Sequence, residues 1–239
     1  MIVSKEIIYD GPGGPFKGYE FYDDAISDYR PGVLVAHTIR GQTEFELEKA
    51  KELAKLGYVG FAIDMYGQDR RTNDSEVGRV WMNELNDDRQ LLRDRMLSAV
   101  DKLRAFGEVD HDLVGGIGYC FGGKCVLDLA RSGVYMSGLV SFHGVYDQPN
   151  LPVRGRIATP LLICHGWDDP LAPPDALMSL TSELNERNAQ WQLEAFSQTG
   201  HAFTNEKADD VYNGMFYSKR AATTSWNSMI HFFGRQFGR

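Results

Sequence analysis

The stretch GGIGYCFGGK, residues 115–124, carries the strongest indication of fold in this chain. Five glycines surround one cysteine, Cys120, and glycine at this density costs backbone entropy that a tight turn would justify. The apolar run LVGGIG (113–118) enters the stretch as a strand, and GGKCVLDLARSG (122–133) leaves it with helical spacing and a final glycine. Cys120 is therefore expected at the tip of a sharp turn from a strand into a helix.

The five residues GYCFG (118–122) have the form of a nucleophile elbow, G-x-Nu-x-G, with cysteine in place of the more usual serine. The neighbours must be small because strand and helix approach closely, and the helix N-terminus stabilises a thiolate and a developing oxyanion. A buried cysteine that acts only as a small hydrophobe is the alternative. A dinucleotide-binding loop starting at Gly116 fits poorly, because Phe121 occupies its last glycine position.

Outward from this turn, apolar runs alternate with helical patterns along the whole chain. Strands are expected at 2–9, 16–22, 31–37, 58–64, 113–118, 138–144, 160–166 and 191–196, and helices at 43–57, 81–106 (one long helix or two abutting ones), 122–133, 173–188 and 217–237. The polar stretch 64–80 is expected to be irregular. Such alternation indicates an α/β fold, with a mostly parallel central sheet and helices on both faces. No linker or repeat divides residues 1–239, so a single domain is predicted.

Charge and cysteine content restrict the partners and the compartment. The formal net charge of −8, from 25 Lys+Arg and 33 Asp+Glu, argues against nucleic-acid and anionic-membrane partners. The first residues, MIVSKEIIYD, do not read as a secretory signal, and no apolar run of membrane-spanning length follows. Three cysteines, an odd number, favour reduced thiols over a disulfide framework. A cytoplasmic protein is the expectation.

Polar residues follow several of the predicted strands, where the carboxyl ends of a parallel sheet hold ligands. A nucleophile needs a base, and the base needs an orienting acid; in α/β-hydrolases the chain order is nucleophile, acid, base. Asp168 and Asp169 come just after one buried strand, and His201 comes just after the last strand. The whole set of candidates at strand ends is His37, Asp64, Cys120, His143, His165, Asp169 and His201.

The other histidines have weaker claims to chemistry. His111 reads as an exposed loop residue and His231 as a structural residue of the last helix, while His37 and His165 are expected to hydrogen-bond the backbone. A metal site built from His37, Asp64, His143 and His165 is the alternative, but no spaced metal motif supports it. No metal is therefore predicted.

The segments GYCFGG, GWDDPLAP, GHAF and VLVAHTIRG together resemble the dienelactone hydrolase family of α/β-hydrolases, over residues 33–203. The resemblance implies Cys120 as nucleophile, Asp169 as acid and His201 as base. Asp169 is preferred to its neighbour Asp168 because the family's acid precedes a proline by four positions, as Asp169 precedes Pro173. The implied oxyanion donors are the N–H groups of Phe121 and Ile39.

Two departures from the family pattern bear on the substrate. Thr38 stands where the family often has a glutamate that helps to deprotonate the cysteine, so His201 has to take that proton alone. Thr204 and Asn205 stand where an arginine would bind a substrate carboxylate. Alternatively, Arg70, Arg71 or Arg89 supplies the cation that binds a substrate carboxylate. The departures favour a neutral substrate.

The sequence thus predicts a thiol-dependent hydrolase of small carboxylic esters or lactones that needs no cofactor. The residues expected to bind substrate are Thr38, Arg89, Tyr66, Trp81, Phe142, His143 and Trp167. For the last five, packing in the core or at the rim is the alternative. A non-catalytic protein of the same fold, which captures a ligand and does not turn it over, is the second hypothesis.

Overall fold

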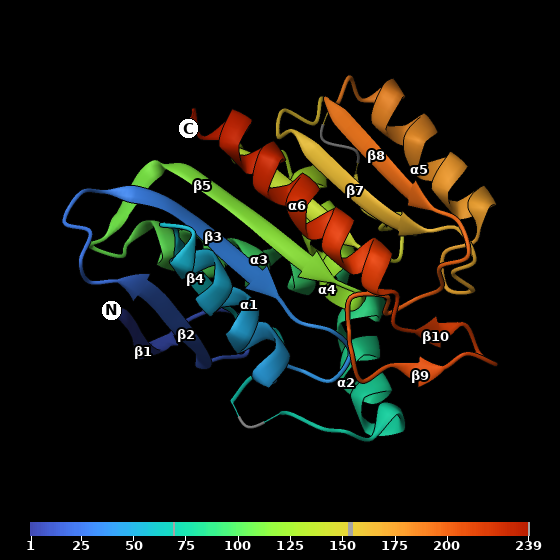
Figure 1. Ribbon diagram of the computed structural model, residues 1–239, viewed down its shortest axis with the longest axis horizontal. Coiled ribbons are helices and arrows are strands. Elements are labelled where there is room, and N and C mark those ends of the chain that lie inside the picture. The colour runs from blue at the N-terminus through green and yellow to red at the C-terminus, as the bar shows by residue number, and fades with distance from the viewer. Residues whose placement is uncertain (69, 153–154, 239) are drawn as a thin grey trace. The chain divides into compact units, whose positions relative to one another are not determined.

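The computed structural model describes residues 1–68, 70–152 and 155–238, and the chain forms two compact units (Figure 1). The first unit, Met1–Ile117, contains β1 (Ile2–Tyr9), β2 (Phe16–Asp23), β3 (Arg30–Ala36), α1 (Glu44–Lys55), β4 (Val59–Ala62), α2 (Ser75–Asp87), α3 (Arg89–Arg104) and most of β5 (Val109–Tyr119). The second unit, Gly118–Arg239, contains α4 (Phe121–Arg131), β6 (Gly138–Phe142), β7 (Leu161–Gly166), α5 (Pro174–Glu186), β8 (Trp191–Phe196), β9 (Asp209–Asp210), β10 (Met215–Phe216) and α6 (Lys219–Gln236). The boundary lies within a strand, and the single domain remains a prediction.

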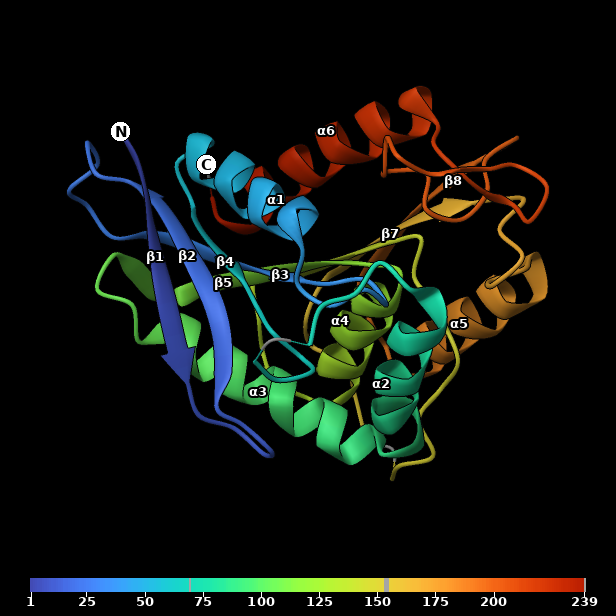
Figure 2. The same cartoon turned by 90° about the horizontal axis from the view of Figure 1, so that it is seen from below.

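Within the described residues, the main sheet has eight strands, ordered β1-β2-β4-β3-β5 in the first unit and β6-β7-β8 in the second. β1 and β2 form an antiparallel hairpin, and β2 is antiparallel to β4, whereas β3 with β4, β6 with β7 and β7 with β8 are parallel. Figure 2 shows α1 and α3 on opposite faces of the strands of the first unit, and α6 and α4 on opposite faces of those of the second. The predicted α/β fold with a mostly parallel sheet is confirmed.

The apolar runs become strands because both of their faces are covered. Every residue of β3, β6 and β7 is buried, as expected for parallel strands between two layers of helices. These strands lie within a few residues of their predicted positions, whereas β5 begins four residues before the predicted start. The ends of parallel strands therefore fall where the sequence placed the candidate polar residues.

The expectation of an irregular segment up to residue 80 is wrong for its last part, because α2 begins at Ser75. The side chain of Asp74 accepts hydrogen bonds from the N–H groups of Glu76 and Val77, which satisfies two of the unpaired donors at this helix start. Asp88 ends α2 and caps α3 by accepting from the N–H of Leu91. Of the two alternatives predicted for residues 81–106, the structure has two abutting helices, each with a capping aspartate.

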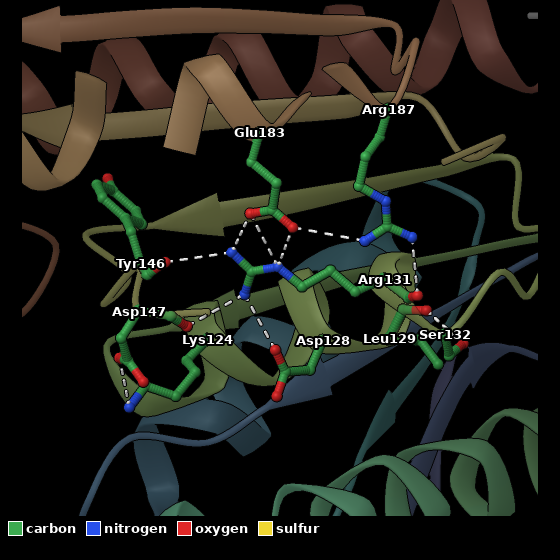
Figure 3. A network of polar contacts seen from close by, with 9 residues as sticks. All are labelled: Lys124, Asp128, Leu129, Arg131, Ser132, Tyr146, Asp147, Glu183 and Arg187. Atoms are coloured by element: carbon green, nitrogen blue, oxygen red, sulfur yellow. Dashed lines mark hydrogen bonds and ion pairs between the residues drawn. The ribbon is translucent and has the colours of Figure 1, made fainter. Parts of the chain in front are cut away.

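A buried polar network joins α4, the helix that starts at the elbow, to α5 (Figure 3). Arg131 donates to both carboxylate oxygens of Glu183, with a shortest distance of 2.7 Å, and to Asp128 at 3.0 Å. It also donates to the backbone oxygens of Tyr146 and Asp147, in the loop after β6. One guanidinium therefore connects two helices and a loop of the second unit. Its removal would leave the buried carboxylates of Asp128 and Glu183 without this cation.

Replacing Arg131 by methionine is expected to lower the free energy of unfolding by about 3–5 kcal/mol, because one partner of a buried ion pair is removed. Urea unfolding at neutral pH measures the loss. Arg79→Met is the control, since Arg79 pairs with Glu76 on the exposed surface of α2 and such pairs contribute about 0–1 kcal/mol. Equal losses for the two variants would contradict a stabilising role of the network.

Three ionisable side chains meet at the edge of the first unit, outside the candidate active site. Glu20 on β2 is buried, with the Lys5 ammonium 3.7 Å from its Oε2. Lys5 also binds Glu108 at 3.0 Å. Burial, followed by the charge of Glu108, raises the pKa of Glu20 from 4.5 to about 7. The folded protein therefore holds this proton more tightly than the unfolded chain does.

This raised pKa predicts a stability that falls with pH. The contribution of Glu20 is fully present below the unfolded pKa of 4.5 and is lost as the pH rises through about 7. Relative to Glu20→Gln, the wild-type free energy of unfolding is expected to fall by on the order of 1 kcal/mol between these values, as chemical unfolding at several pH values would measure. Glu6→Gln, on the exposed face of the same hairpin, should leave the profile unchanged. Parallel profiles for wild type and Glu20→Gln would contradict the prediction.

Candidate active site

Cys120 lies at the turn between β5 and α4, in a backbone conformation that non-glycine residues rarely adopt. Its φ is 55° and its ψ is −114°. The Cys120 N–H donates to the backbone oxygen of Phe142 at 3.1 Å, and its carbonyl accepts from the N–H of Lys124 at 3.3 Å. A strained backbone of this kind persists only where the surrounding structure fixes it. The conformation places the partly exposed thiol at the tip of the turn.

The glycine before the nucleophile position is required by close approach. A Cβ at Gly118 would lie 2.0 Å from the backbone oxygen of Gly122, in the first turn of α4. No rotation of a side chain relieves a contact with backbone, so any larger residue would push the helix away from the strand. This is the physical reason for the glycine two residues before the cysteine.

Asp169 and His201 come together from the loops after β7 and β8. The His201 Nδ1–H donates to Asp169 Oδ2 at 2.8 Å, and the two residues are 3% and 2% exposed. The other carboxylate oxygen of Asp169 accepts from the N–H groups of Leu171 and Ala172. Asp168, by contrast, is exposed. Of the two neighbouring aspartates, only Asp169 bonds the imidazole among the described contacts.

The charge balance at His201 favours the protonated imidazole. Burial alone would lower the pKa of His201, but the charge of the Cys120 thiolate and the hydrogen bond to Asp169 raise it to about 10. A hydrogen bond between the His201 ring and the Cys120 side chain also raises this pKa. The ring thus bonds Asp169 through Nδ1 and also contacts the candidate nucleophile.

A short hairpin that the sequence did not indicate fixes the backbone of His201. The His201 N–H donates to the backbone oxygen of Gly214 at 2.7 Å, and the His201 carbonyl accepts from the N–H of Phe216 at 3.1 Å. Gly214 and Phe216 belong to the β9–β10 hairpin, whose strands have two residues each and leave no periodic signal. The base is therefore on a loop that is tied down on both sides.

Two further histidines lie near the Asp169–His201 pair. The ring of His143, which is 2% exposed, packs at an angle against His201 with centroids 5.0 Å apart. His165 Nδ1 lies 3.0 Å from the hydroxyl of Tyr146. His165 thus bonds a side chain where a backbone partner was expected.

The other predicted pocket residues of the second unit differ in exposure. Phe142 is buried and stacks on Tyr119 with centroids 4.8 Å apart, which is the core position named as its alternative. Trp167 is 45% exposed beside the Asp169 loop.

In the first unit, the loops after β3 and β4 and the helix α2 bring three of the predicted residues together. The Tyr66 hydroxyl donates to the carbonyl of Ile39 at 3.2 Å, and the rings of Tyr66 and Trp81 lie 5.9 Å apart. His37 bonds the backbone as expected, through the Thr38 carbonyl and the N–H of Met65. Tyr66 thus orients the Ile39 peptide, and the roles of these residues toward Cys120 stay predictions.

A carboxylate that the sequence interpretation missed lies beside Thr38. Glu46 is buried in the first turn of α1, where its Oε1 accepts from the N–H of Thr38 at 3.1 Å. Its Oε2 accepts from both the N–H and the hydroxyl of Thr43, which completes a capping box. A glutamate that fixes this loop is therefore present, but its oxygens accept hydrogen bonds from the Thr38 backbone and from Thr43 at the start of α1.

The arginines proposed as carboxylate ligands have partners of their own. Arg70 pairs with Glu84 at 2.6 Å on the exposed surface. The Arg71 guanidinium donates to the carbonyl and the side chain of Gln42. Arg89 is buried at the start of α3. A substrate carboxylate would have to compete with these contacts for Arg70 and Arg71.

Metal and disulfide sites find no support in the part of the chain that the structure describes. No group of three or more His, Cys, Asp or Glu side chains in it is placed to hold a metal ion. None of Cys120, Cys125 and Cys164 forms a disulfide. Among the described helices, none combines the length and the apolar character needed to cross a membrane.

Comparison with known proteins places this geometry in a family. Residues 16–237 match the dienelactone hydrolase family. The chain is similar to the solved structure named m3DLH, with 34% identity and a TM-score of 0.91 over 99% of both chains. It is also similar to a dienelactone hydrolase-like promiscuous phosphotriesterase from metagenomic libraries, with 31% identity and a TM-score of 0.93 over 99% of both chains.

A curated relative is similar to this chain in sequence. The "Probable 2-oxo-3-(5-oxofuran-2-ylidene)propanoate lactonase" of Bradyrhizobium sp. is 28% identical over 211 residues, which cover 84% of this chain and 82% of the relative. The match of the family over nearly the whole chain agrees with the elbow, the sheet and the paired acid and histidine. The chain belongs to the dienelactone hydrolase family.

Proposed function

We propose that the protein is a thiol-dependent hydrolase of carboxylic esters or lactones that works through an acyl-enzyme on Cys120. Membership of the family makes it a hydrolase of ester or lactone bonds. The observation that carries the finer proposal is the His201 ring, which bonds Asp169 at 2.8 Å through Nδ1 while the Cys120 thiolate raises its pKa. These are the contacts that a general base next to a cysteine nucleophile needs.

In the first half of the reaction, His201 Nε2 takes the Cys120 proton and the thiolate attacks the acyl carbon. The oxyanion that forms is bound by the predicted donors, the N–H groups of Phe121 and Ile39, each of which contributes roughly 3–4 kcal/mol to barrier lowering. The tetrahedral intermediate then collapses. The C–O bond to the alcohol breaks, His201 returns the proton to the leaving oxygen, and a thioester remains on Cys120.

In the second half, water attacks the thioester and transfers a proton to His201. The new C–O bond forms as the C–S bond breaks, so the acid product leaves and the thiolate is restored. Asp169 holds the imidazole tautomer and stabilises the imidazolium in both halves. Its second oxygen, bonded to two backbone N–H groups, keeps the carboxylate in place.

Stopped-flow hydrolysis of p-nitrophenyl butyrate, combined with intact-mass analysis of quenched samples, tests this proposal. A thiol-dependent hydrolase gives a steady state of turnover and a butyryl adduct that maps to Cys120. A ligand-capturing protein of the same fold would give one burst of nitrophenol and no steady state. Turnover without any adduct on Cys120 would contradict the thiol mechanism while leaving the hydrolase assignment intact.

The residues favour a small neutral substrate. The relatives differ on this point: one is named as a phosphotriesterase, whose substrates are uncharged, and one as the lactonase of a propanoate, which carries a carboxylate. This chain has Thr204 and Asn205 in place of the expected arginine, and Arg71 is bound to Gln42. A buried carboxylate without a charged partner does not recover its desolvation energy.

A neutral ester is accordingly expected to have a kcat/KM at least about tenfold higher than its carboxylate-bearing analogue, a difference of about 1.4 kcal/mol. Initial rates for an alkyl ester and the matching half-ester of a dicarboxylic acid measure this ratio. Asn205→Arg supplies the missing cation and should shift the ratio toward the acid. A tenfold preference of the wild type for the acid, lost in Arg70→Ala, Arg71→Ala or Arg89→Ala, would overturn the prediction.

A further inference from the structure

The β9–β10 hairpin packs against both of the loops that carry the acid–base pair. It lies beyond the carboxyl ends of β7 and β8, the strands that Asp169 and His201 follow (Figure 1). Gly214, in the turn of the hairpin, accepts the His201 N–H at 2.7 Å, and Phe216 on β10 donates its N–H to the His201 carbonyl at 3.1 Å. These two bonds fix the backbone of the base.

Gly214 also lies against the loop of the acid. Its φ is 70°, in the left-handed region, and a Cβ at this residue would lie 2.9 Å from Cδ and 3.0 Å from Cγ of Pro170. Pro170 directly follows Asp169, and its ring is closed on its own backbone nitrogen, so the ring cannot rotate away. A side chain at position 214 would therefore push on the backbone next to the carboxylate.

The loop of the acid, the loop of the base and the turn of the hairpin approach one another backbone to backbone. A Cβ on Gly166, the last residue of β7, would lie 2.5 Å from the carbonyl oxygen of Gly200. A Cβ on Gly200 would in turn overlap the carbonyl oxygen of Gly214. The Asp168 N–H also donates to the Thr199 carbonyl at 2.9 Å. A shift of the turn therefore reaches both loops, because contacts between backbones have no side chain that could rotate to absorb it.

We propose that Gly214 is a positioning residue for the acid–base pair, whose turn sets the imidazole of His201 against the carboxylate of Asp169. The inference rests on the proposed function, since it assigns a residue to the geometry of that reaction's base. The bond to be kept joins His201 Nδ1 and Asp169 Oδ2 at 2.8 Å, between two residues that are almost fully buried. A hydrogen bond weakens steeply as its length or angle leaves the preferred range, so a small displacement of either loop weakens it.

A displaced turn is expected to change the base in two measurable ways. The carboxylate of Asp169 holds the imidazole in the tautomer that catalysis needs, so kcat falls when the bond weakens. The same hydrogen bond is one of the causes of the raised pKa of His201, so this pKa falls as well. His201 is the base in both halves of the reaction, so both halves slow together and KM stays close to that of the wild type.

The competing explanation is that Gly214 only allows the hairpin to turn and contributes to stability alone. Gly133 provides the matched control, because its φ of 84° is also left-handed and a Cβ on it would have no described atom within 4 Å. It follows α4 at the end of the helix away from Cys120. Gly133→Ala and Gly214→Ala therefore introduce similar backbone strain, whereas the contact with Pro170 arises in Gly214→Ala.

The experiment measures hydrolysis of p-nitrophenyl butyrate, the midpoint of thermal unfolding and the pKa of His201. The pKa comes from a pH titration by NMR of protein with isotope-labelled histidine, in which the His201 signals are identified by their loss in His201→Gln. In Gly214→Ala, kcat is expected to fall by about ten- to a hundredfold with KM within about threefold, since small misplacements of catalytic groups cost this much. The pKa of His201 is expected to fall by about one pH unit.

Gly133→Ala should keep both kcat and the pKa of His201 at their wild-type values while its unfolding midpoint falls by about 2–8 °C. Gly214→Asn separates strain from contact, because asparagine tolerates a positive φ but still carries a Cβ, and it should lose as much kcat as Gly214→Ala. Pro170→Ala removes the ring atoms that this Cβ would meet. Alone it should stay close to the wild type, and combined with Gly214→Ala it should recover most of the lost kcat, as coupled neighbours do.

Wild-type kcat and His201 pKa in Gly214→Ala, or equal losses of kcat in Gly214→Ala and Gly133→Ala, would overturn the inference. So would a double variant with Pro170→Ala that is no more active than Gly214→Ala. Should Gly214→Ala fail to fold, Asp210→Ala takes its place, since it loosens the exposed tip by removing two hydrogen bonds from Asn213. Wild-type kcat and His201 pKa in that variant and in Gly214→Asn would then overturn the inference. A wild type without turnover would instead overturn the proposed function, while the His201 pKa in the variants still tests the role of Gly214.

Discussion

Cys120→Ala is expected to lower kcat by about 10⁶-fold, because removal of the nucleophile leaves only binding and oxyanion stabilisation. The substitution keeps a Cβ in the same strained conformation at φ 55°, so the turn and its hydrogen bond to Phe142 should survive. Steady-state hydrolysis of p-nitrophenyl butyrate measures the loss, and circular dichroism checks the fold. Brief iodoacetamide treatment of the wild type should label Cys120 and remove activity in parallel.

Cys125→Ala is the matched control for this result. Cys125 lies in α4, the helix that follows Cys120, and is fully buried, so its loss should leave kcat within a few-fold of the wild type. Burial also raises the pKa of the Cys164 thiol well above its usual value, which makes it unreactive. Labelling of Cys125 or Cys164 ahead of Cys120, with activity retained, would contradict the thiol mechanism.

Asp169→Asn is expected to lower kcat by about 10⁴-fold without unfolding the protein, because an amide at this place favours the wrong tautomer of His201. The carboxylate is one of the causes of the raised pKa of His201, so the pKa should also fall in the variant. A pH titration of kcat/KM measures both effects. The carboxylate is 2.8 Å from the imidazole and almost fully buried, and no other described acidic side chain bonds His201.

Asp168→Asn serves as the neighbouring control. Asp168 is exposed. Among the described contacts, its backbone N–H donates to the carbonyl of Thr199, which lies in the loop before His201. The substitution keeps that N–H, so a change of less than about fivefold in kcat is expected, a free-energy difference of about 1 kcal/mol. A larger effect at Asp168 than at Asp169 would mean that Asp168, and not Asp169, is the carboxylate that orients His201.

Much of the fold could be predicted because the buried strands carry their own signal. The run from Val33 to Ala36 is apolar throughout, and a parallel strand covered on both faces needs that pattern. The start of α2 was missed because it depends on one aspartate, Asp74, in a stretch crowded with polar residues that could each end or begin a helix. The β9–β10 hairpin is too short to show a period, and only its bonds to His201 make it important.

The candidate site could be predicted in part for a similar reason. Cys120, Asp169 and His201 each follow a strand, so local patterns place them at one edge of the sheet. The contact of Thr204 with His143 joins residues 61 positions apart and leaves no local trace. Glu46 was missed because a glutamate in the first turn of a helix usually faces solvent and stabilises the helix start. Here the same carboxylate is buried and reaches the Thr38 backbone.

The hairpin after His201 also has a consequence for engineering this chain. The contacts that fix the histidine backbone use Gly214, in the turn of the hairpin, and Phe216 on β10, and Tyr212 in the same turn is 97% exposed. Exposed tips usually accept inserted residues, but here the Gly214 N–H closes the turn by donating to the carbonyl of Val211. A peptide tag, a reporter or a recruited domain inserted after Tyr212 would therefore interrupt the turn that anchors the base, and such additions belong elsewhere on this chain.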